Sequence, residues 1–186
     1  GRRKLQLFHR KDRKDKKMKY FVPTYRKENI KTAELFKELD YLLFCDKKDY
    51  DRWSKKYKCF LLPDGVQGNI ARVRNYILNY ARDEKIEKFA MCDDDISKVY
   101  KYDSSLKSRM KEMNPVDYDY IIDLFSDVFY QKENCVGWSM NETSQPRDYK
   151  GEIGCNNACF MSGTFSIYFT DRITFDFDEM LSLKED

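Results

Sequence analysis

Short apolar segments alternate with helix-like segments through the first half of the chain, and this order constrains the fold more than any other feature. The predicted strands there are 19–25, 40–46, 58–65 and 88–94, and the predicted helices are 29–39, 49–57 and 68–85. Such alternation is typical of βαβ units, in which parallel strands form a sheet with helices on both sides. The second half has strand-like segments at 134–141 and 157–169, so we expect antiparallel strands to extend the sheet. The predicted fold class is therefore α/β, with a mainly parallel central sheet.

Two helices have the clearest patterns. In the segment 68–85 an apolar stripe recurs at helical spacing, and Asn69 is in place to cap the first turn. The stripe consists of Ile70, Val73, Ile77 and Tyr80. In the segment 117–131 the residues with helical spacing are Ile121, Leu124, Phe125 and Val128. Residues 103–114 are polar and are expected to form a loop, and residues 173–186 are expected to combine a turn with a short helix.

Positive charge is concentrated at the N-terminus. A length of 186 residues fits one domain, but residues 1–19 carry ten basic and two acidic side chains, a net charge of +8. The whole chain is +3, so the other residues sum to −5. We therefore predict a basic, flexible tail over residues 1–18 and one mildly acidic domain over residues 19–186. Such a tail can follow the phosphates of a nucleic acid by releasing counterions, and a solvated arm or a leftover of expression is equally consistent with it.

Cysteine and histidine usage argues against a zinc site of Cys/His type. The chain has six cysteines without a C-x-x-C pair, and His9 is its only histidine. A leading signal peptide and a run of about 18 apolar residues are both lacking. Free, mostly buried thiols are usual in a reducing compartment, so we expect a cytoplasmic protein without a membrane span.

Three consecutive aspartates, Asp93, Asp94 and Asp95, follow the apolar segment 88–92. In a parallel α/β sheet, ligands bind outside the carboxyl ends of the strands, where these residues are expected. Because side chains alternate along a strand, we expect Asp93 and Asp95 to point the same way, with Asp94 as a neighbouring or solvated residue. Two convergent carboxylates repel each other unless they share a cation, and their oxygens suit Mg²⁺ or Mn²⁺ beside a diphosphate. A solvated acidic turn is the simpler alternative.

Polar residues also follow the first and second predicted strands. Pro23 and Thr24 begin a turn in which Tyr25 offers a face to a base and Arg26 offers a fork to phosphate. Asp46 follows the second strand and can accept a hydrogen bond from a ribose or a base. Each of these features alone is ordinary for a surface loop.

The start of the third predicted helix is suited to an anion. Gly65 and Gly68 loosen the backbone before this helix, whose N-terminus can face a phosphate. Arg72 lies off the apolar stripe and Arg74 lies beside it, so one of the two can reach a phosphate at the strand ends. Two solvated helix arginines are the alternative.

Two acidic residues, Glu185 and Asp186, follow a short apolar stretch near the C-terminus. A carboxylate there can act as a general base on an acceptor hydroxyl. An exposed acidic end is the simpler explanation when this stretch is considered by itself.

Taken together, these segments resemble the GT-A class of nucleotide-sugar glycosyltransferases, whose fold is Rossmann-like. The resemblance rests on the order of VPTYR, FCD, GNIARVRNYILNYA, CDDDI, MSGTFSIYF, FDE and KED. It implies a nucleotide-sugar site made of Pro23, Thr24, Tyr25, Arg26, Asp46, Gly68, Arg74 and Asp93. It also implies that Asp93 and Asp95 hold Mn²⁺ or Mg²⁺, and that Asp186, with Glu185 beside it, is the catalytic base of an inverting enzyme.

Within that class, FVPTYRKENIKTAELF, ARVRNYIL and MCDDDI are most similar to the TET-associated glycosyltransferases, a family well represented in phages. The similarity covers roughly residues 19 to 186. It implies transfer of a sugar to hydroxymethylated pyrimidines in DNA. The chain departs from the GT-A pattern in two ways. Many GT-A enzymes use a late histidine as a further metal ligand, whereas the histidine here is His9, and they normally continue past the ED motif, where this chain stops at Asp186.

The sequence therefore supports three hypotheses. The first is a metal-dependent glycosyltransferase that takes a nucleotide-diphosphate sugar and modifies hydroxymethylated DNA in the cytoplasm, or in the host cytoplasm if a phage encodes it. The second keeps the reaction but places the sugar on a polysaccharide, lipid or protein hydroxyl, which suits the acidic body better than DNA does. The third is a degenerate domain that binds a nucleotide sugar without transferring it.

Overall fold

The computed structural model describes residues 18–103, 105–106, 110–140 and 163–180. In its first half, strands and helices alternate as the sequence predicts. These elements are β1 (Lys19–Pro23), α1 (Lys31–Leu35), β2 (Asp40–Cys45), α2 (Lys47–Trp53), β3 (Cys59–Leu61), α3 (Ile70–Asp83) and β4 (Lys88–Cys92). They are followed by β5 (Tyr100–Tyr102), β6 (Met110–Glu112), α4 (Pro115–Tyr130), β7 (Gly137–Ser139), β8 (Phe165–Phe169) and the 3-10 helix η2 (Thr170–Arg172).

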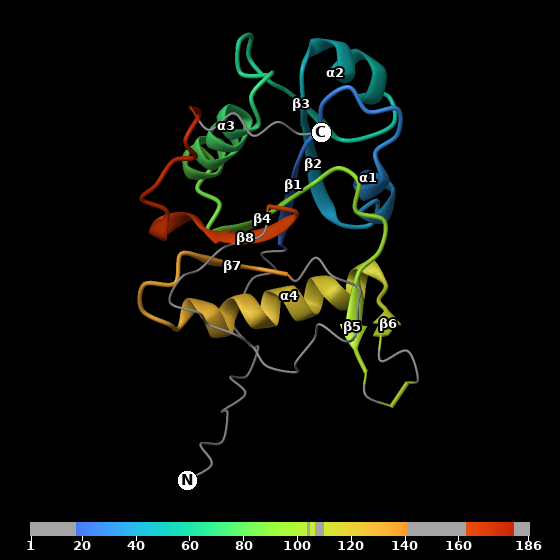
Figure 1. Ribbon diagram of the computed structural model, residues 1–186, viewed down its shortest axis with the longest axis vertical. Coiled ribbons are helices and arrows are strands. Elements are labelled where there is room, and N and C mark those ends of the chain that lie inside the picture. Colours follow the sequence, from blue (N-terminus) through green and yellow to red (C-terminus); the bar gives the residue numbers. More distant parts are fainter. Residues whose placement is uncertain (1–17, 104, 107–109, 141–162, 181–186) are drawn as a thin grey trace.

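A six-stranded sheet with the strand order β3-β2-β1-β4-β8-β7 forms the centre of the molecule (Figure 1). The strands β3, β2, β1 and β4 run parallel, and β8 and β7 each pair antiparallel with their neighbour. The chain builds outward from β1 to β3 and then returns through α3 to place β4 on the other side of β1. The strand order therefore reverses between β1 and β4, which makes this pair the topological switch point of the sheet. The predicted α/β class, with a mainly parallel sheet and an antiparallel extension, is confirmed.

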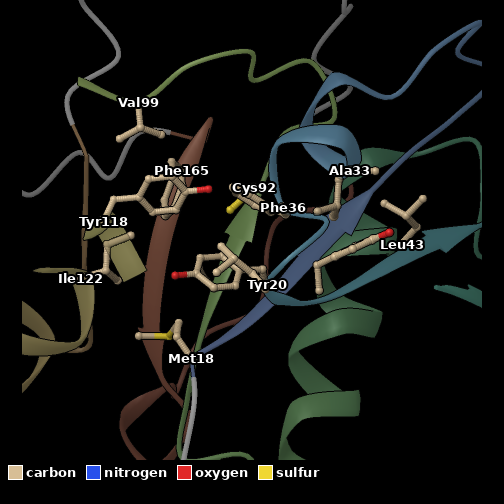
Figure 2. Close-up of a cluster of buried hydrophobic side chains, with 14 of the residues drawn as sticks. Met18, Tyr20, Ala33, Phe36, Leu43, Cys92, Val99, Tyr118, Ile122 and Phe165 are labelled. Atoms are coloured by element: carbon tan, nitrogen blue, oxygen red, sulfur yellow. The ribbon is translucent and has the colours of Figure 1, made fainter. Parts of the chain in front are cut away.

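Helices cover both faces of the sheet because its central strands are apolar on both faces. Successive side chains of β1 point to opposite faces, so Tyr20 belongs to one buried cluster and Phe21 to the other. The cluster around Tyr20 contains Ala33 of α1, Phe36 just after α1, and Ile122 of α4 (Figure 2). The cluster around Phe21 is closed by α3. Two separate cores therefore hold β1 in place, and with it the loop that follows β1.

The helix α3 forms as its sequence pattern predicts. Val73 and Ile77 are buried against the sheet, and Ile70 and Tyr80 are half-buried. The side chain of Asn69 accepts a hydrogen bond from the backbone N–H of Arg72 at 3.1 Å, which satisfies one of the free donors of the first turn. The predicted N-cap and apolar stripe are both confirmed.

The helix α4 is confirmed, but its buried face differs from the residues that the pattern singled out. Leu124 and Val128 are 43% and 42% exposed, whereas Tyr118, Ile122 and Phe129 are buried. The helix carries apolar side chains on more than one side, so its periodicity does not decide which side meets the sheet. The buried side is the one whose Tyr118 and Ile122 fit into the cluster around Tyr20.

One local expectation is wrong, and another is tested only in part. Within the predicted loop 103–114, residues Met110–Glu112 form the strand β6, which pairs antiparallel with β5 in a separate two-stranded sheet. Its side chains are mostly exposed and polar, so the strand carries no apolar signal. Of the predicted turn and short helix over 173–186, the described part, 173–180, contains no helix and follows the 3-10 turn η2, and residues 181–186 lie outside the described residues.

The described cysteines Cys45, Cys59, Cys92 and Cys135 are free thiols, as predicted. Among the helices of the described ranges, none has the length and apolarity needed to cross a membrane.

We predict that the sheet depends on the buried side chain of Leu43 in β2. Leu43 is 0% exposed in the cluster around Tyr20, so Leu43→Ala leaves a cavity in that core and should lower the free energy of unfolding by about 2–5 kcal/mol. Leu61→Ala in β3 is the matched control, since Leu61 is 41% exposed and should cost well under half as much. Urea unfolding followed by circular dichroism measures both, and equal losses would contradict the assigned burial.

Candidate functional site

The aspartate triplet lies at the carboxyl end of β4, at the switch point, and Asp94 joins it to β1. The hydroxyl of Thr24, the first residue after β1, donates a hydrogen bond to Asp94 Oδ2 at 2.8 Å. The ammonium of Lys27 lies 3.5 Å from Asp94 Oδ1. Asp94 is 7% exposed, and burial raises the pKa of its carboxyl while Thr24 and Lys27 lower it. Asp94 is therefore a buried bridge between strand ends, so of the two alternatives predicted for it the solvated one is wrong and the neighbouring one holds.

A second clamp fixes the backbone of the triplet. The hydroxyl of Thr32, in the first turn of α1, donates to the carbonyl of Asp93 at 2.6 Å and accepts from the N–H of Ile96 at 2.9 Å. The N–H of Thr32 donates to the carbonyl of Asp94 at 3.2 Å. Thr32 is 0% exposed, so these bonds are shielded from water. One side chain thus holds both ends of the turn that contains Asp94 and Asp95.

Asp93 faces Arg74, which reaches the strand ends from α3. Arg74 Nη2 lies 3.4 Å from Asp93 Oδ1, and the Arg74 side chain is 16% exposed. Burial raises the pKa of the Asp93 carboxyl, Arg74 lowers it, and the negative charge of Asp95 raises it further. Gly163 allows the guanidinium to lie there, because a Cβ at that position would come within 3.2 Å of Arg74 Nη2. Of the two candidate arginines, Arg74 is therefore the one directed at the strand ends.

The carboxylates of the triplet are suited to a metal ion whose other ligands come from a substrate. Within the described residues, no group of three or more His, Cys, Asp or Glu side chains is arranged to hold a metal ion. Asp95 is exposed in the turn after β4, and the Asp93 side chain is 37% exposed. Mg²⁺ is commonly held by one or two carboxylates, with phosphate oxygens and waters completing its shell. Asp93 and Asp95 fit that arrangement, whereas both oxygens of Asp94 already have partners.

The loop after β1 is held against α2. Arg26 adopts a left-handed φ of +53°, which costs on the order of 1 kcal/mol for a residue with a Cβ. Its N–H donates to the carboxylate of Asp49, a buried residue of α2. The guanidinium of Arg26 stacks over the ring of Tyr25, with 4.7 Å between Cζ and the ring centroid. Both side chains remain exposed at the surface.

Asp46 has a structural task at the end of β2. It is the N-cap of α2, and its Oδ1 accepts a hydrogen bond from the N–H of Asp49 at 2.9 Å. Because Oδ1 of Asp46 caps α2, the predicted hydrogen bond from a ribose or base would go to the second carboxylate oxygen.

The glycine turn before α3 also contacts the end of β1. Gly65 and Gly68 have φ values of +81° and +95°, a region that strains other residues. Between them, the side-chain amide of Gln67 donates to the carbonyl of Thr24 at 2.9 Å. The predicted loosening of the backbone is thus seen at both glycines. Gln67 ties this turn to the switch point.

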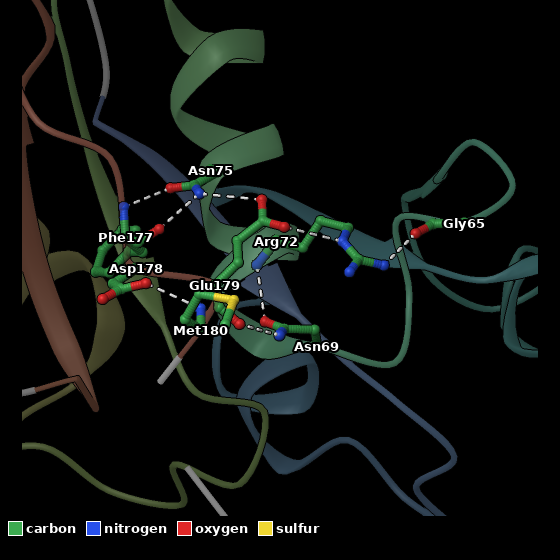
Figure 3. A network of polar contacts seen from close by, with 8 residues as sticks. All are labelled: Gly65, Asn69, Arg72, Asn75, Phe177, Asp178, Glu179 and Met180. Carbon is green, nitrogen blue, oxygen red and sulfur yellow. Dashed lines mark hydrogen bonds and ion pairs between the residues drawn. The ribbon is translucent and has the colours of Figure 1, made fainter. Parts of the chain in front are cut away.

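Arg72 does not reach the strand ends, because it anchors the chain segment 177–180 (Figure 3). It lies 3.2 Å from the carboxylate of Glu179 and donates to the carbonyl of Gly65 at 2.7 Å. Asn75 donates to the carbonyl of Phe177 at 2.9 Å and accepts from the N–H of Phe177 at 2.6 Å. Through these contacts α3 holds the segment that leads toward the C-terminus.

A groove of about 660 Å³ opens on the α1 and α2 side of the triplet. Its wall includes Ile30, Trp53 and Tyr57, with Lys31 at the side and Ser97, two residues after Asp95. This volume lies within the range of small-molecule sites, about 300–1,000 Å³. Aromatic walls of this kind suit a flat ring.

The structure thus brings Thr24, Asp93, Asp94 and Arg74 together and turns Arg72 away. Glu185 and Asp186 lie outside the described residues, and their predicted role as base stays a prediction. Among the residues that shape the site and that sequence reasoning missed are Thr32, Lys27 and Asn75. Neighbouring sequence gives no signal for them, because each one acts on a partner at least 60 residues away.

Comparison of this chain with protein-family models, with curated proteins and with solved structures finds no match. The site is therefore interpreted from its own geometry.

We predict that Thr32→Val loosens the triplet. The substitution removes the acceptor of the Ile96 N–H and the donor to the Asp93 carbonyl, and leaving buried polar groups unpaired costs about 1–3 kcal/mol each. Hydrogen exchange at the Ile96 amide should become faster. Thr32→Ser keeps the hydroxyl and should preserve the protection of this amide. Unchanged exchange in Thr32→Val would contradict the clamp.

Proposed function

We propose that this protein is a metal-dependent glycosyltransferase of the GT-A type that moves a sugar from a nucleotide-diphosphate donor to a hydroxyl group. One observation carries the proposal. At the switch point of a parallel sheet, where α/β proteins bind nucleotides, the accessible carboxylates of Asp93 and Asp95 lie in one turn, and the guanidinium of Arg74 lies 3.4 Å from Asp93. A carboxylate pair suits a divalent cation, and a guanidinium suits a phosphate. A nucleoside diphosphate with its metal ion presents both.

The residues of the site have distinct roles in this proposal. Asp93 and Asp95 hold Mg²⁺ or Mn²⁺, and Arg74 leaves Asp93 to bind the diphosphate. When bound, the cation stabilises negative charge on the leaving diphosphate as a Lewis acid. Thr24 and Asp94 keep the strand ends in register while the donor binds. Tyr25 and Arg26, exposed after β1, contact the nucleoside.

The acceptor is proposed to be a 5-hydroxymethylated pyrimidine in DNA. A base in a duplex must leave the stack to be modified, and the groove beside the triplet, with Trp53 and Tyr57, has room for a flat ring. The basic segment 1–18 supplies contacts to the phosphate backbone.

Asp186, with Glu185, deprotonates the acceptor hydroxyl. The anchoring of Phe177 and Glu179 on α3 supports this role, because it holds the preceding segment on the helix that carries Arg74. We place the reaction in the cytoplasm, or in the host cytoplasm if a phage encodes the protein.

We predict that Mn²⁺ and a nucleoside diphosphate together stabilise the fold. At a ligand concentration of a hundred times Kd, stabilisation is about 2.7 kcal/mol, which corresponds to roughly 5–10 °C in Tm for a chain of this size. Asp93→Asn and Asp95→Asn should each remove most of this shift. Asp83→Asn, at the end of α3, is the control and should keep it. Equal shifts in all three variants would contradict the assigned ligands.

We also predict metal-dependent sugar transfer. The protein is incubated with Mn²⁺, nucleotide sugars and duplex DNA that carries hydroxymethylcytosine, and released nucleoside diphosphate and DNA mass are measured. Arg74→Gln should slow transfer about a hundredfold or more, because a charge-stabilising group worth several kcal/mol is lost. Chelation of Mn²⁺ should abolish it.

The outcomes of this experiment separate the three hypotheses. Donor hydrolysis without transfer to DNA would favour a carbohydrate, lipid or protein acceptor, a reading that the net charge of −5 outside residues 1–19 supports. Donor binding without hydrolysis or transfer would favour a binding module. Neither binding nor release with any donor would overturn the proposal.

A further inference from the structure

The helix α4 presents a continuous apolar stripe to solvent. Its residues are spaced by four and are Val116, Tyr120, Leu124 and Val128, with exposed fractions of 60%, 52%, 43% and 42%. Residues four apart lie on the same side of a helix, so these side chains form one surface along all of α4. A contiguous exposed apolar surface of this kind on a globular domain marks an interaction site.

The surroundings of the stripe are acidic, which limits what can cover it. The helix carries four aspartates and no basic residue. Asp119 accepts a hydrogen bond from Tyr20, and Asp123 and Asp127 lie 2.5 and 3.3 Å from the ammonium of Lys88. The four aspartates of α4 and Lys88 together carry a formal charge of −3. A second copy of this helix would bring like charges together across the stripe. The complementary partner is apolar and basic.

We propose that residues 1–17 of the same chain, the N-terminal segment, dock on the α4 stripe. This segment contains nine basic and two acidic residues, a net charge of +7, and its apolar residues are Leu5, Leu7 and Phe8. Its chemistry therefore complements both the charge and the apolar surface of α4. The inference does not depend on the proposed sugar transfer, and in that reaction DNA would have to displace the segment from α4 before its basic residues contact the phosphates.

The point where the N-terminal segment joins the domain favours this occupant. Met18 is 1% exposed and belongs to the same buried cluster as Tyr118 and Ile122 of α4 (Figure 2). Seventeen residues can span about 55 Å, and a helix of 16 residues is about 24 Å long, so the segment reaches the whole stripe. A tethered segment also acts at an effective concentration of about millimolar, which a partner in solution rarely matches.

Trypsin provides the test, because the N-terminal segment is rich in Lys and Arg whereas α4 has neither. In the full-length chain, cleavage within residues 1–17 should be about tenfold slower than in a synthetic peptide of the same residues, since only the undocked population is cut. Leu124→Ser should raise the rate toward that of the peptide. Leu61→Ser is the matched control, with 41% exposure outside the stripe, and should behave as wild type.

A second variant keeps the test independent of the stability of α4. The triple substitution Leu5→Ser/Leu7→Ser/Phe8→Ser leaves the described domain unchanged and should also raise the cleavage rate, measured against a peptide of its own sequence. Equal rates for the wild type, Leu124→Ser and the free peptide would overturn the proposal. A dimer in sedimentation that Leu124→Ser dissociates, with unchanged tail cleavage, would assign the stripe to a second copy and would also overturn it.

Discussion

The hydrogen bond from Thr24 to the buried carboxylate of Asp94 joins the ends of β1 and β4, and the candidate site depends on it. Burial of a carboxylate is costly unless its oxygens are paired, and here a hydroxyl and the ammonium of Lys27 pair them. The bond spans the switch point beyond Phe21 and Met91, the last residues paired between β1 and β4. This bond and the contacts of Thr32 fix a turn in which Asp93 and Asp95 remain accessible to solvent while Asp94 is buried.

The helix α3 connects this turn to the rest of the molecule. One side of α3 closes the core around Phe21, and from its first two turns Arg74 extends toward Asp93. From the same turns, Arg72 and Asn75 hold the segment that runs toward the C-terminus. A single helix therefore positions the phosphate-binding candidate and the path of the chain toward the predicted base. Residues two apart point to different sides of a helix, which explains why Arg72 and Arg74 have different partners.

Much of the fold could be predicted from sequence, because the parallel strands are apolar and the cap at Asn69 is local. The position of the triplet at a strand end was also predictable. The arrangement within it was not, since alternation assumes an extended backbone, whereas the chain turns after Cys92 and buries Asp94. Thr32 acts through contacts across more than 60 residues, which periodicity does not encode. The exposed side of α4 was missed because Leu124 has the spacing of a core residue.

A structure of the protein crystallised with Mn²⁺ and a nucleoside diphosphate tests the central claim most directly. Anomalous scattering locates Mn²⁺ without reference to the protein model. We expect the ion between Asp93 and Asp95, with its remaining ligands from the diphosphate and water, and we expect Arg74 on a phosphate oxygen. Mn²⁺ bound away from these carboxylates, or a nucleotide bound elsewhere on the sheet, would contradict the account.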